Sequence, residues 1–540
     1  MIAMPTTNQF TTFFAITAVI VTALAIRGAH ITADTPAGLS SDHGTYVDEG
    51  YKTLAARNLL LFGADKWHPA DTYGGWLKAS PLTQWPYYLS FLASQPDIAA
   101  ARTVTIAYYA LFLVLYCFLL YGRYCPSVFY AGLLLLSLES TLFFFSRIAL
   151  FEIPMVTLVY ALLMFFKKTM EPISSIVLYS LVVAAILAFS IKKSALVYFV
   201  PVFLAIVMSL TYRYSDTARL ARYCLALAVG VVILLSITYD DWSRRIALAP
   251  DDYLIRLIDN PLMTVSPFIV LAGLFCAIHG VLYQPMHYLT NLYRLTLICL
   301  VILGPIILAL FTAHPLRYYV PFLPASILIS IEWLSLRKLP CDISGPNAVR
   351  TALAVFLLLL FTSYCVVALG VEDRINIMLL SNIILLGILV VGTAFFLWML
   401  RRVVFSQIGS LIIVLGFLTL GFTQSLMRIG DFLANPSFCA EQVRHELTKI
   451  VNSNEVIAGD WAPFFALGTP IRALYSQKET NPPYALLQIK PRYFLHSESG
   501  SSMYQRNALR RHPNISLGSP RNLGTYNGSK ITLYPLSYSS

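Results

Sequence analysis

The sequence predicts an all-α polytopic membrane protein with about thirteen transmembrane helices and a small C-terminal extracytoplasmic α/β domain. Three observations predict this fold class. The 540 residues are 57% hydrophobic and only 12% charged, whereas soluble domains carry roughly a quarter charged residues. The hydrophobic residues form long blocks separated by short polar loops, as spanning helices of roughly 20 residues require. Ordinary polarity returns only near residue 427.

The apolar blocks give the spans in order. The block from 126 to 166 is too long for one span and is interrupted by Arg147 and Glu152, so it is expected to form two spans joined by a tight outer turn at 146–152. The other expected spans lie near residues 10–28, 99–121, 173–190, 194–211, 223–239, 265–283, 295–312, 318–335, 351–369, 377–400 and 407–425.

The chain therefore divides into a transmembrane domain, 1–426, and a C-terminal α/β domain, 427–540. Within the second domain, the apolar spacing of Ser437–Ile450 indicates an amphipathic helix. Short β-rich runs predict strands at Glu455–Ala458, Tyr493–His496 and Ile531–Tyr534.

The net charge of +11 reflects membrane topology rather than nucleic-acid binding. Most basic residues fall in alternate short loops, which the positive-inside bias places in the cytoplasm. The intervening loops hold most of the acidic residues and are expected outside; they include 29–98, 146–152 and 240–264. This assignment places the N-terminus inside and, with an odd number of spans, the C-terminal domain outside.

Two adjacent carboxylates, Asp48 and Glu49, lie in the first outer loop and are followed by Tyr51. One carboxylate of such a pair can accept a proton from a hydroxyl while the other orients it or binds a cation. The alternative is that both are solvated surface charges.

Other charged groups lie close to the predicted hydrocarbon. Lys78, in an aromatic segment, is expected either to hold an anionic lipid head group or to snorkel to the interface. Arg147 and Glu152 are either functional or a structural pair. Lys192 and Lys193 are unusual in an outer turn unless an anion binds there.

A last group follows at the outer end of a span, where His314, Arg317 and Tyr318 precede Pro321. A single histidine there is more often an interface residue than a base. All these groups nevertheless face one compartment beside lipid. Carboxylates and cations in this setting suit the cleavage of a sugar–phosphate bond on a lipid carrier, in which the cations stabilise the departing phosphate.

The order of these motifs resembles that of the GT-C membrane glycosyltransferases, in the branch of protein O-mannosyltransferases and lipid A aminoarabinose transferases. The resemblance covers roughly the first 335 residues and, more loosely, the C-terminal domain. It rests on Asp48-Glu49 after the first span, Lys78-x-x-Pro81-Leu with a nearby tryptophan, Arg147-x-x-x-x-Glu152, and Arg317-Tyr318 before a proline-rich span.

The resemblance implies that Asp48 is the base and that Lys78 and Arg147 face the donor phosphate. Glu152 would be the second acid, where the family commonly has Asp, and Ala79-Ser80 stand where the family commonly has proline. The large lumenal insertions of eukaryotic mannosyltransferases are absent, which favours a bacterial inner-membrane relative with a periplasmic C-terminal domain.

The expected activity is inverting transfer from a polyprenyl-phosphate-linked sugar to a lipid, glycan or protein acceptor. Besides the donor and acceptor, the expected partners are membrane lipids, with no nucleic acid. The residues leave metal dependence open, since carboxylates with one histidine suit Mg²⁺, Mn²⁺ or no metal. The candidates are catalytic Asp48, Glu49 and Glu152; donor phosphate-binding Lys78, Arg147, Lys192, Lys193 and Arg317; and substrate-binding Tyr51, His314 and Tyr318.

Three alternatives stay open at this stage. A lipid-linked glycan polymerase or ligase would use diphosphate donors and rely more on arginines. A transporter would show inverted repeats or broken spans in matched halves, which the sequence lacks. A non-catalytic scaffold would not need so many charges at membrane level on one face.

Overall fold

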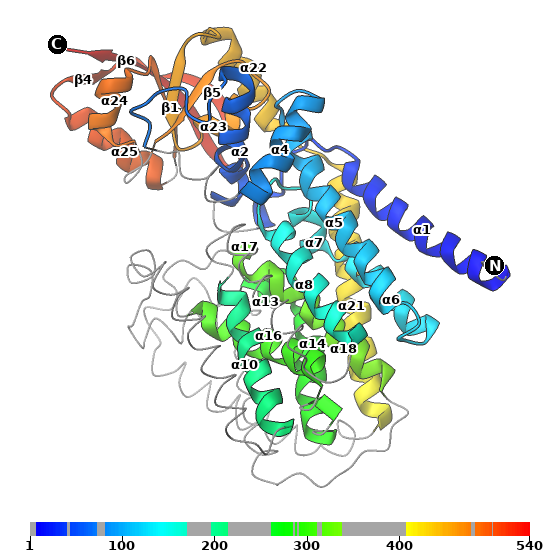
Figure 1. Ribbon diagram of the computed structural model, residues 1–540. Coiled ribbons are helices and arrows are strands. Elements are labelled where there is room, and N and C mark those ends of the chain that lie inside the picture. Colours follow the sequence, from blue (N-terminus) through cyan, green and yellow to red (C-terminus); the bar gives the residue numbers. More distant parts are fainter. Residues whose placement is uncertain are drawn as a thin grey trace, which may run out of the picture.

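The computed structural model describes residues 7–39, 44–72, 81–169, 196–213, 261–284, 287–288, 291–309, 316–336, 407–476, 481–498 and 500–539. Its helices form a bundle with a mixed α/β domain at one end (Figure 1). The predicted spans 173–190, 223–239, 351–369 and 377–400 lie outside the described residues.

The bundle is built from apolar helices, most of which coincide with the predicted spans in the described ranges, whereas α13 lies mainly in the predicted loop 240–264. They are α1 (Thr7–Gly28), α5 (Ile98–Leu120), α6 (Pro126–Leu138), α7 (Ser140–Phe145), α8 (Glu152–Thr169), α10 (Leu196–Arg213), α13 (Pro261–Val265), α14 (Pro267–Tyr283), α16 (Leu292–Ala309), α17 (Leu316–Tyr319), the 3₁₀ turn η3 (Val320–Phe322), α18 (Leu323–Ser335) and α21 (Gln407–Ala434).

Polar side chains set several helix ends. Asp97 caps α5 by accepting a hydrogen bond from the backbone N–H of Ala100 at 2.8 Å. Glu139 separates α6 from α7 and accepts from Leu142 N at 2.7 Å and from Ser266 Oγ at 2.6 Å. The turn predicted at 146–152 lies between α7 and α8, where it was expected.

Among the described residues, two helical stretches are long and apolar enough to cross a membrane. They are Ile98–Leu120, with a mean hydropathy of 2.1, and Gly409–Ile450, with 1.8. The other apolar helices in the described ranges are shorter. The count of about thirteen spans therefore stays a prediction.

The end of the bundle next to the C-terminal domain carries the remaining elements. The segment between α1 and α5 contains η1 (Ala37–Leu39), α2 (Gly44–Phe62) and α4 (Pro81–Ala93). The C-terminal domain contains α22 (Cys439–Ile450), β1 (Val456–Gly459), α23 (Ala462–Ala466), β2 (Arg472–Tyr475), α24 (Pro483–Ile489), β3 (Tyr493–Ser497), α25 (Gly500–Arg511), β4 (Ile515–Leu517), β5 (Arg521–Tyr526) and β6 (Ser529–Tyr538).

The C-terminal domain is a mixed six-stranded sheet of order β2-β1-β3-β6-β4, with β5 also paired to β6. Strands β1, β2 and β3 are parallel, and β6 is antiparallel to β3, β4 and β5. The predicted amphipathic helix corresponds to α22, and the three predicted strands correspond to β1, β3 and β6. These predictions are confirmed to within the usual boundary error.

Helix α2 lies at the interface between the bundle and the C-terminal domain, beside α23 (Figure 1). A Cβ atom on Gly50 would lie 2.1 Å from the backbone nitrogen of Phe464 in α23, so the two helix backbones touch at this glycine. Arg57 follows Gly50 by seven residues in α2 and is buried. It donates hydrogen bonds to the carbonyls of Thr469 and Ile471 at 2.8 and 2.6 Å.

Candidate active site

Asp48 and Glu49 are both buried at the start of α2, but they have different partners. Asp48 forms an ion pair with Arg317 of α17. This pair joins the first outer loop to the end of a predicted span far along the chain. The sequence placed both residues outside on the basis of topology, and the structure brings them into contact.

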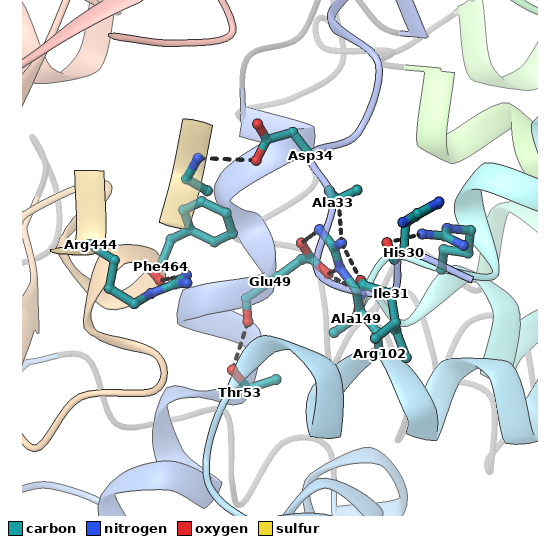
Figure 2. Close-up of polar contacts among 12 residues, drawn as sticks. His30, Ile31, Ala33, Asp34, Glu49, Thr53, Arg102, Ala149, Arg444 and Phe464 are labelled. Carbon is teal, nitrogen blue, oxygen red and sulfur yellow. Dashed lines mark hydrogen bonds and ion pairs between the residues drawn. The ribbon is translucent and has the colours of Figure 1, made fainter. Parts of the chain in front are cut away.

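Glu49 is engaged on both carboxylate oxygens. Arg102 of α5 donates from Nε to Oε1 at 2.9 Å and from Nη2 to Oε2 at 2.7 Å, and the backbone N–H of Ala149 donates to Oε1 at 2.7 Å. Arg102 also donates from Nη1 to the carbonyls of Ile31 and Ala33 at 2.7 and 2.6 Å. Figure 2 shows Glu49 and Arg102 facing each other between these segments. The cluster fixes α2 against three other parts of the chain.

Arg147 lies in the turn between α7 and α8, and its guanidinium points to the end of α1. It donates to the carbonyls of Arg27, Ala29 and His30 at 2.5, 2.6 and 2.6 Å, so it satisfies carbonyls that a helix end leaves open. Its guanidinium carbon also lies 4.6 Å from the ring centroid of Phe432. Burial lowers the pKa of Arg147 to about 9.

Glu152 is the first residue of α8 and is buried, where a helix N-terminus favours a negative charge. Next to it in sequence, Phe151 contacts a cation that sequence reasoning missed. The Nζ atom of buried Lys52 lies 5.1 Å from the Phe151 ring centroid and 4.8 Å from that of Tyr51. The signal available in the sequence was spacing, since Lys52 follows Asp48 by four residues on one helix face.

The C-terminal domain contacts Tyr51 through the carboxyl end of β2. The ring of Tyr475, its last residue, lies 4.8 Å from the ring of Tyr51, centroid to centroid. Burial raises the pKa of Tyr475, and so does the charge of nearby Asp460, whereas the Arg317 guanidinium opposes this rise. Tyr475 is therefore within electrostatic reach of both Arg317 and Asp460, which no sequence motif indicated.

Tyr318, the remaining substrate-binding candidate in the described residues, lies next to Arg317. The Arg317 guanidinium carbon is 5.4 Å from the Tyr318 ring centroid. The Tyr318 carbonyl accepts a hydrogen bond from the hydroxyl of Tyr198 in α10 at 2.6 Å. This bond helps to hold α17, and with it Arg317, against the bundle.

Comparison with known proteins places this geometry in a known fold. No family model and no curated protein matches the sequence. Among solved structures, the apo crystal structure of ArnT from Cupriavidus metallidurans matches over 97% of this chain and 98% of ArnT, with 14% identity and a TM-score of 0.53. The chain has the ArnT fold. A second ArnT crystal structure, bound to undecaprenyl phosphate, covers the same shares at 14% identity with a TM-score of 0.49.

The resemblance expected from the motif order is therefore confirmed at the level of the fold. Four of the candidates, Lys78, Lys192, Lys193 and His314, lie outside the described residues. Within the part of the chain that the structure describes, no three His, Cys, Asp or Glu side chains form a group that could hold a metal ion.

In this ArnT-like bundle, the described candidates share one end, and a second ionic cluster marks the other. Helices α5 and α8 run from Arg102 and Glu152 towards that cluster. There, buried Glu332 accepts from Lys167 Nζ at 2.5 Å, from Arg294 Nε at 2.8 Å and from the hydroxyl of Tyr124 at 2.5 Å.

Proposed function

We propose that the protein is a membrane glycosyltransferase that moves a sugar from a polyprenyl-phosphate-linked donor to an acceptor hydroxyl at the outer face of the membrane. The observation that carries this proposal is the buried contact between Asp48 and Arg317 at one end of an ArnT-like bundle. A carboxylate can act as a base and a guanidinium can bind a phosphate. Apolar helices beside both groups provide a place for a polyprenyl chain.

In the proposed reaction, Asp48 takes the proton of the acceptor hydroxyl as its oxygen bonds to the anomeric carbon. The bond between that carbon and the phosphate oxygen breaks, and the phosphate leaves on the polyprenyl carrier with the bonding electron pair. A single displacement of this kind inverts the anomeric configuration. Arg317 stabilises the negative charge that develops on the phosphate.

The contacts suggest separate roles for the other candidates. Glu49, engaged by Arg102 and Ala149, is proposed to position α2 rather than to move a proton. Arg147, engaged by three carbonyls at the end of α1, is proposed to brace that end. Lys52 joins Lys78 as a proposed phosphate-binding cation, and Glu152 stays proposed as the second acid.

We further propose that the protein lies in a bacterial inner membrane with its C-terminal domain in the periplasm. The acceptor is a lipid, a glycan or a protein, all of which are available at that surface. The arrangement of short basic loops and acidic outer loops supports this orientation. Labelling of cysteines introduced near Gly63 and Ser540 from outside the cell, with protection of one near Ser215, tests it.

The test of the reaction is turnover by the purified full-length protein with a polyprenyl-phosphate-linked sugar. Donor consumption and release of polyprenyl phosphate are followed by mass spectrometry. Asp48→Asn keeps the size of the side chain but cannot accept the proton, so turnover is expected to fall at least about a hundredfold. Glu446→Gln, which alters an exposed carboxylate paired with Lys449, is the control and should keep full turnover.

Two results would contradict the proposal. Near-normal turnover by a correctly inserted Asp48→Asn protein would remove Asp48 as the base. Turnover with a polyprenyl-diphosphate-linked donor but not with the monophosphate donor would indicate a glycan polymerase or ligase instead.

A further inference from the structure

The proposed base is not free to act in the structure described here, because Asp48 is held by Arg317. Asp48 is 4% exposed, and the Arg317 side chain is 15% exposed. A carboxylate in a buried ion pair is stabilised in its charged form and is a weaker base than a carboxylate without a cation. The guanidinium also occupies one of the two carboxylate oxygens, Oδ2.

The neighbouring ion pair shows what a permanent structural pair looks like in this protein. Arg102 binds Glu49 through two nitrogens and the carbonyls of Ile31 and Ala33 through the third. Its position is over-determined by the backbone around it. Arg317, by contrast, lies in α17, a helix of only four residues, and its side chain is 15% exposed, compared with 2% for Arg102.

A phosphate is a suitable competitor for this arginine. The planar guanidinium binds phosphate oxygens in a bidentate manner, as it binds carboxylates. A polyprenyl-phosphate-linked sugar has one negative charge on its phosphate, and the polyprenyl monophosphate released after transfer has up to two near neutral pH. The charge that attracts Arg317 therefore rises during the reaction.

We propose that Arg317 exchanges between Asp48 and the lipid-linked phosphate, so that donor binding itself releases the base. Without donor, Arg317 masks Asp48. With donor, Arg317 binds the phosphate and Asp48 becomes available to the acceptor hydroxyl. After transfer, the monophosphate keeps Arg317 until the lipid leaves, and Asp48 then recaptures it. This inference rests on the proposed function, since it needs a phosphate on the substrate.

The exchange of Arg317 between Asp48 and the phosphate predicts a result that the simple loss of an active-site residue does not. Asp48 and the phosphate compete for one cation, so removing the charge of Asp48 should strengthen phosphate binding while it abolishes turnover. Affinity for a polyprenyl monophosphate is measured by native mass spectrometry titration of the full-length protein. Asp48→Asn is expected to bind about tenfold more tightly than the wild type. Arg317→Ala is expected to bind at least about tenfold more weakly than the wild type.

Three further samples isolate the cause. The double variant Asp48→Asn/Arg317→Ala should bind like Arg317→Ala, because Asp48 acts only through Arg317. Asp48→Glu keeps the charge and should bind within about twofold of the wild type. A polyprenol without phosphate should show no gain with Asp48→Asn. Thermal unfolding midpoints establish that each variant is folded.

The outcomes separate this inference from the function on which it rests. If the wild type binds the monophosphate and Asp48→Asn binds it equally or more weakly, the exchange is wrong while the proposed function stands. An equal gain for the polyprenol would also overturn it, since the gain would not come from the phosphate. If the wild type binds no polyprenyl monophosphate, both the proposed function and the exchange fail.

Discussion

Asp48 and Glu49 are neighbours in sequence but point in different directions, since adjacent residues on a helix are about 100° apart. One meets Arg317 of α17 and the other meets Arg102 of α5. The two carboxylates therefore have separate surroundings and can have separate roles. The role of Glu49 is the easier to test, because its contacts are structural.

Glu49→Gln is expected to destabilise the protein because it leaves the Arg102 guanidinium buried without its counter-charge. Breaking a buried ion pair on one side typically costs about 3–5 kcal/mol. The thermal midpoint of the purified protein should fall clearly, and the double variant Glu49→Gln/Arg102→Gln should lose less than the sum of the single losses. Lost turnover with an unchanged midpoint would instead support the catalytic role first expected for Glu49.

A second residue-scale prediction concerns pH and His496 of β3. His496 Nε2 accepts from Arg506 Nη1 at 3.1 Å, and its Nδ1 lies 2.9 Å from Ser502 Oγ. Burial and the Arg506 and Arg510 guanidinium groups lower the pKa of His496 to about 4. Between pH 6.5 and 4 the unfolded chain binds a proton that the folded chain refuses, so stability falls as the pH falls through this window.

His496→Gln removes this titration. The measurement is the thermal midpoint of wild type and variant at a series of pH values from 7.5 to 4.5. The difference between the two proteins should change across the window, with the wild type losing more on acidification. Parallel curves would show that His496 does not titrate as the structure indicates.

At this scale the sequence indicated the two acids but not their buried partners. Asp48 and Glu49 were noticeable because two charges follow the end of an apolar block. Arg102 was missed because a single arginine at the start of a span is typical of an interface residue that reaches water. Its burial depends on Ile31, Ala33 and Glu49, which come from other segments.

Among the elements, the contact between α2 and α23 is the most demanding. A Cβ on Gly50 would lie 2.1 and 2.3 Å from the nitrogen and Cα atoms of Phe464 and 2.5 Å from the carbonyl carbon of Pro463. These are backbone atoms, which cannot move aside cheaply. Gly50→Ala would therefore push the helix that carries Asp48 away from the C-terminal domain.

Gly50→Ala is expected to cost about 1–3 kcal/mol through overpacking and to lower turnover by displacing Asp48. The matched control is Gly430→Ala in α21, where a Cβ meets nothing within 4 Å. Both variants gain similar helix propensity, so their difference in thermal midpoint and turnover reports the contact. Equal behaviour of the two variants would mean that α2 does not need this close approach.

Elements with strong periodicity were predictable, and those with polar or very short sequences were not. The strands β1, β3 and β6 carry apolar runs, whereas β5, Arg521–Tyr526, is mostly polar because it pairs only along one edge. The five-residue helix α23 is shorter than any periodicity test can resolve. Yet α23 is the element against which the proposed base helix packs.

For the molecule as a whole, the predicted boundary at 426/427 separates sequence composition but not contacts. Asp34, after α1, accepts hydrogen bonds from the N–H groups of Cys439 and Ala440 at 2.6 and 3.1 Å, so it caps α22 from the other end of the chain. Asp71 accepts from Asn481 Nδ2 at 2.6 Å. Contacts between segments that are distant in sequence leave no local pattern in a single sequence. The topology could therefore predict that these residues lie on the same side, but not which of them contact each other.

The packing of α2 on α23 has a consequence for biosynthesis. Ribosomes add roughly 5–20 residues per second, so the roughly 400 residues between these helices separate their synthesis by tens of seconds. During that interval the newly made N-terminal loop lacks its permanent partner and is a target for proteases and chaperones. A nascent chain that stops before α22 would insert its helices but would still lack the proposed active site. The reason is that the C-terminal domain, which is translated last, contains α23, and α23 is the helix that sets Asp48 in place.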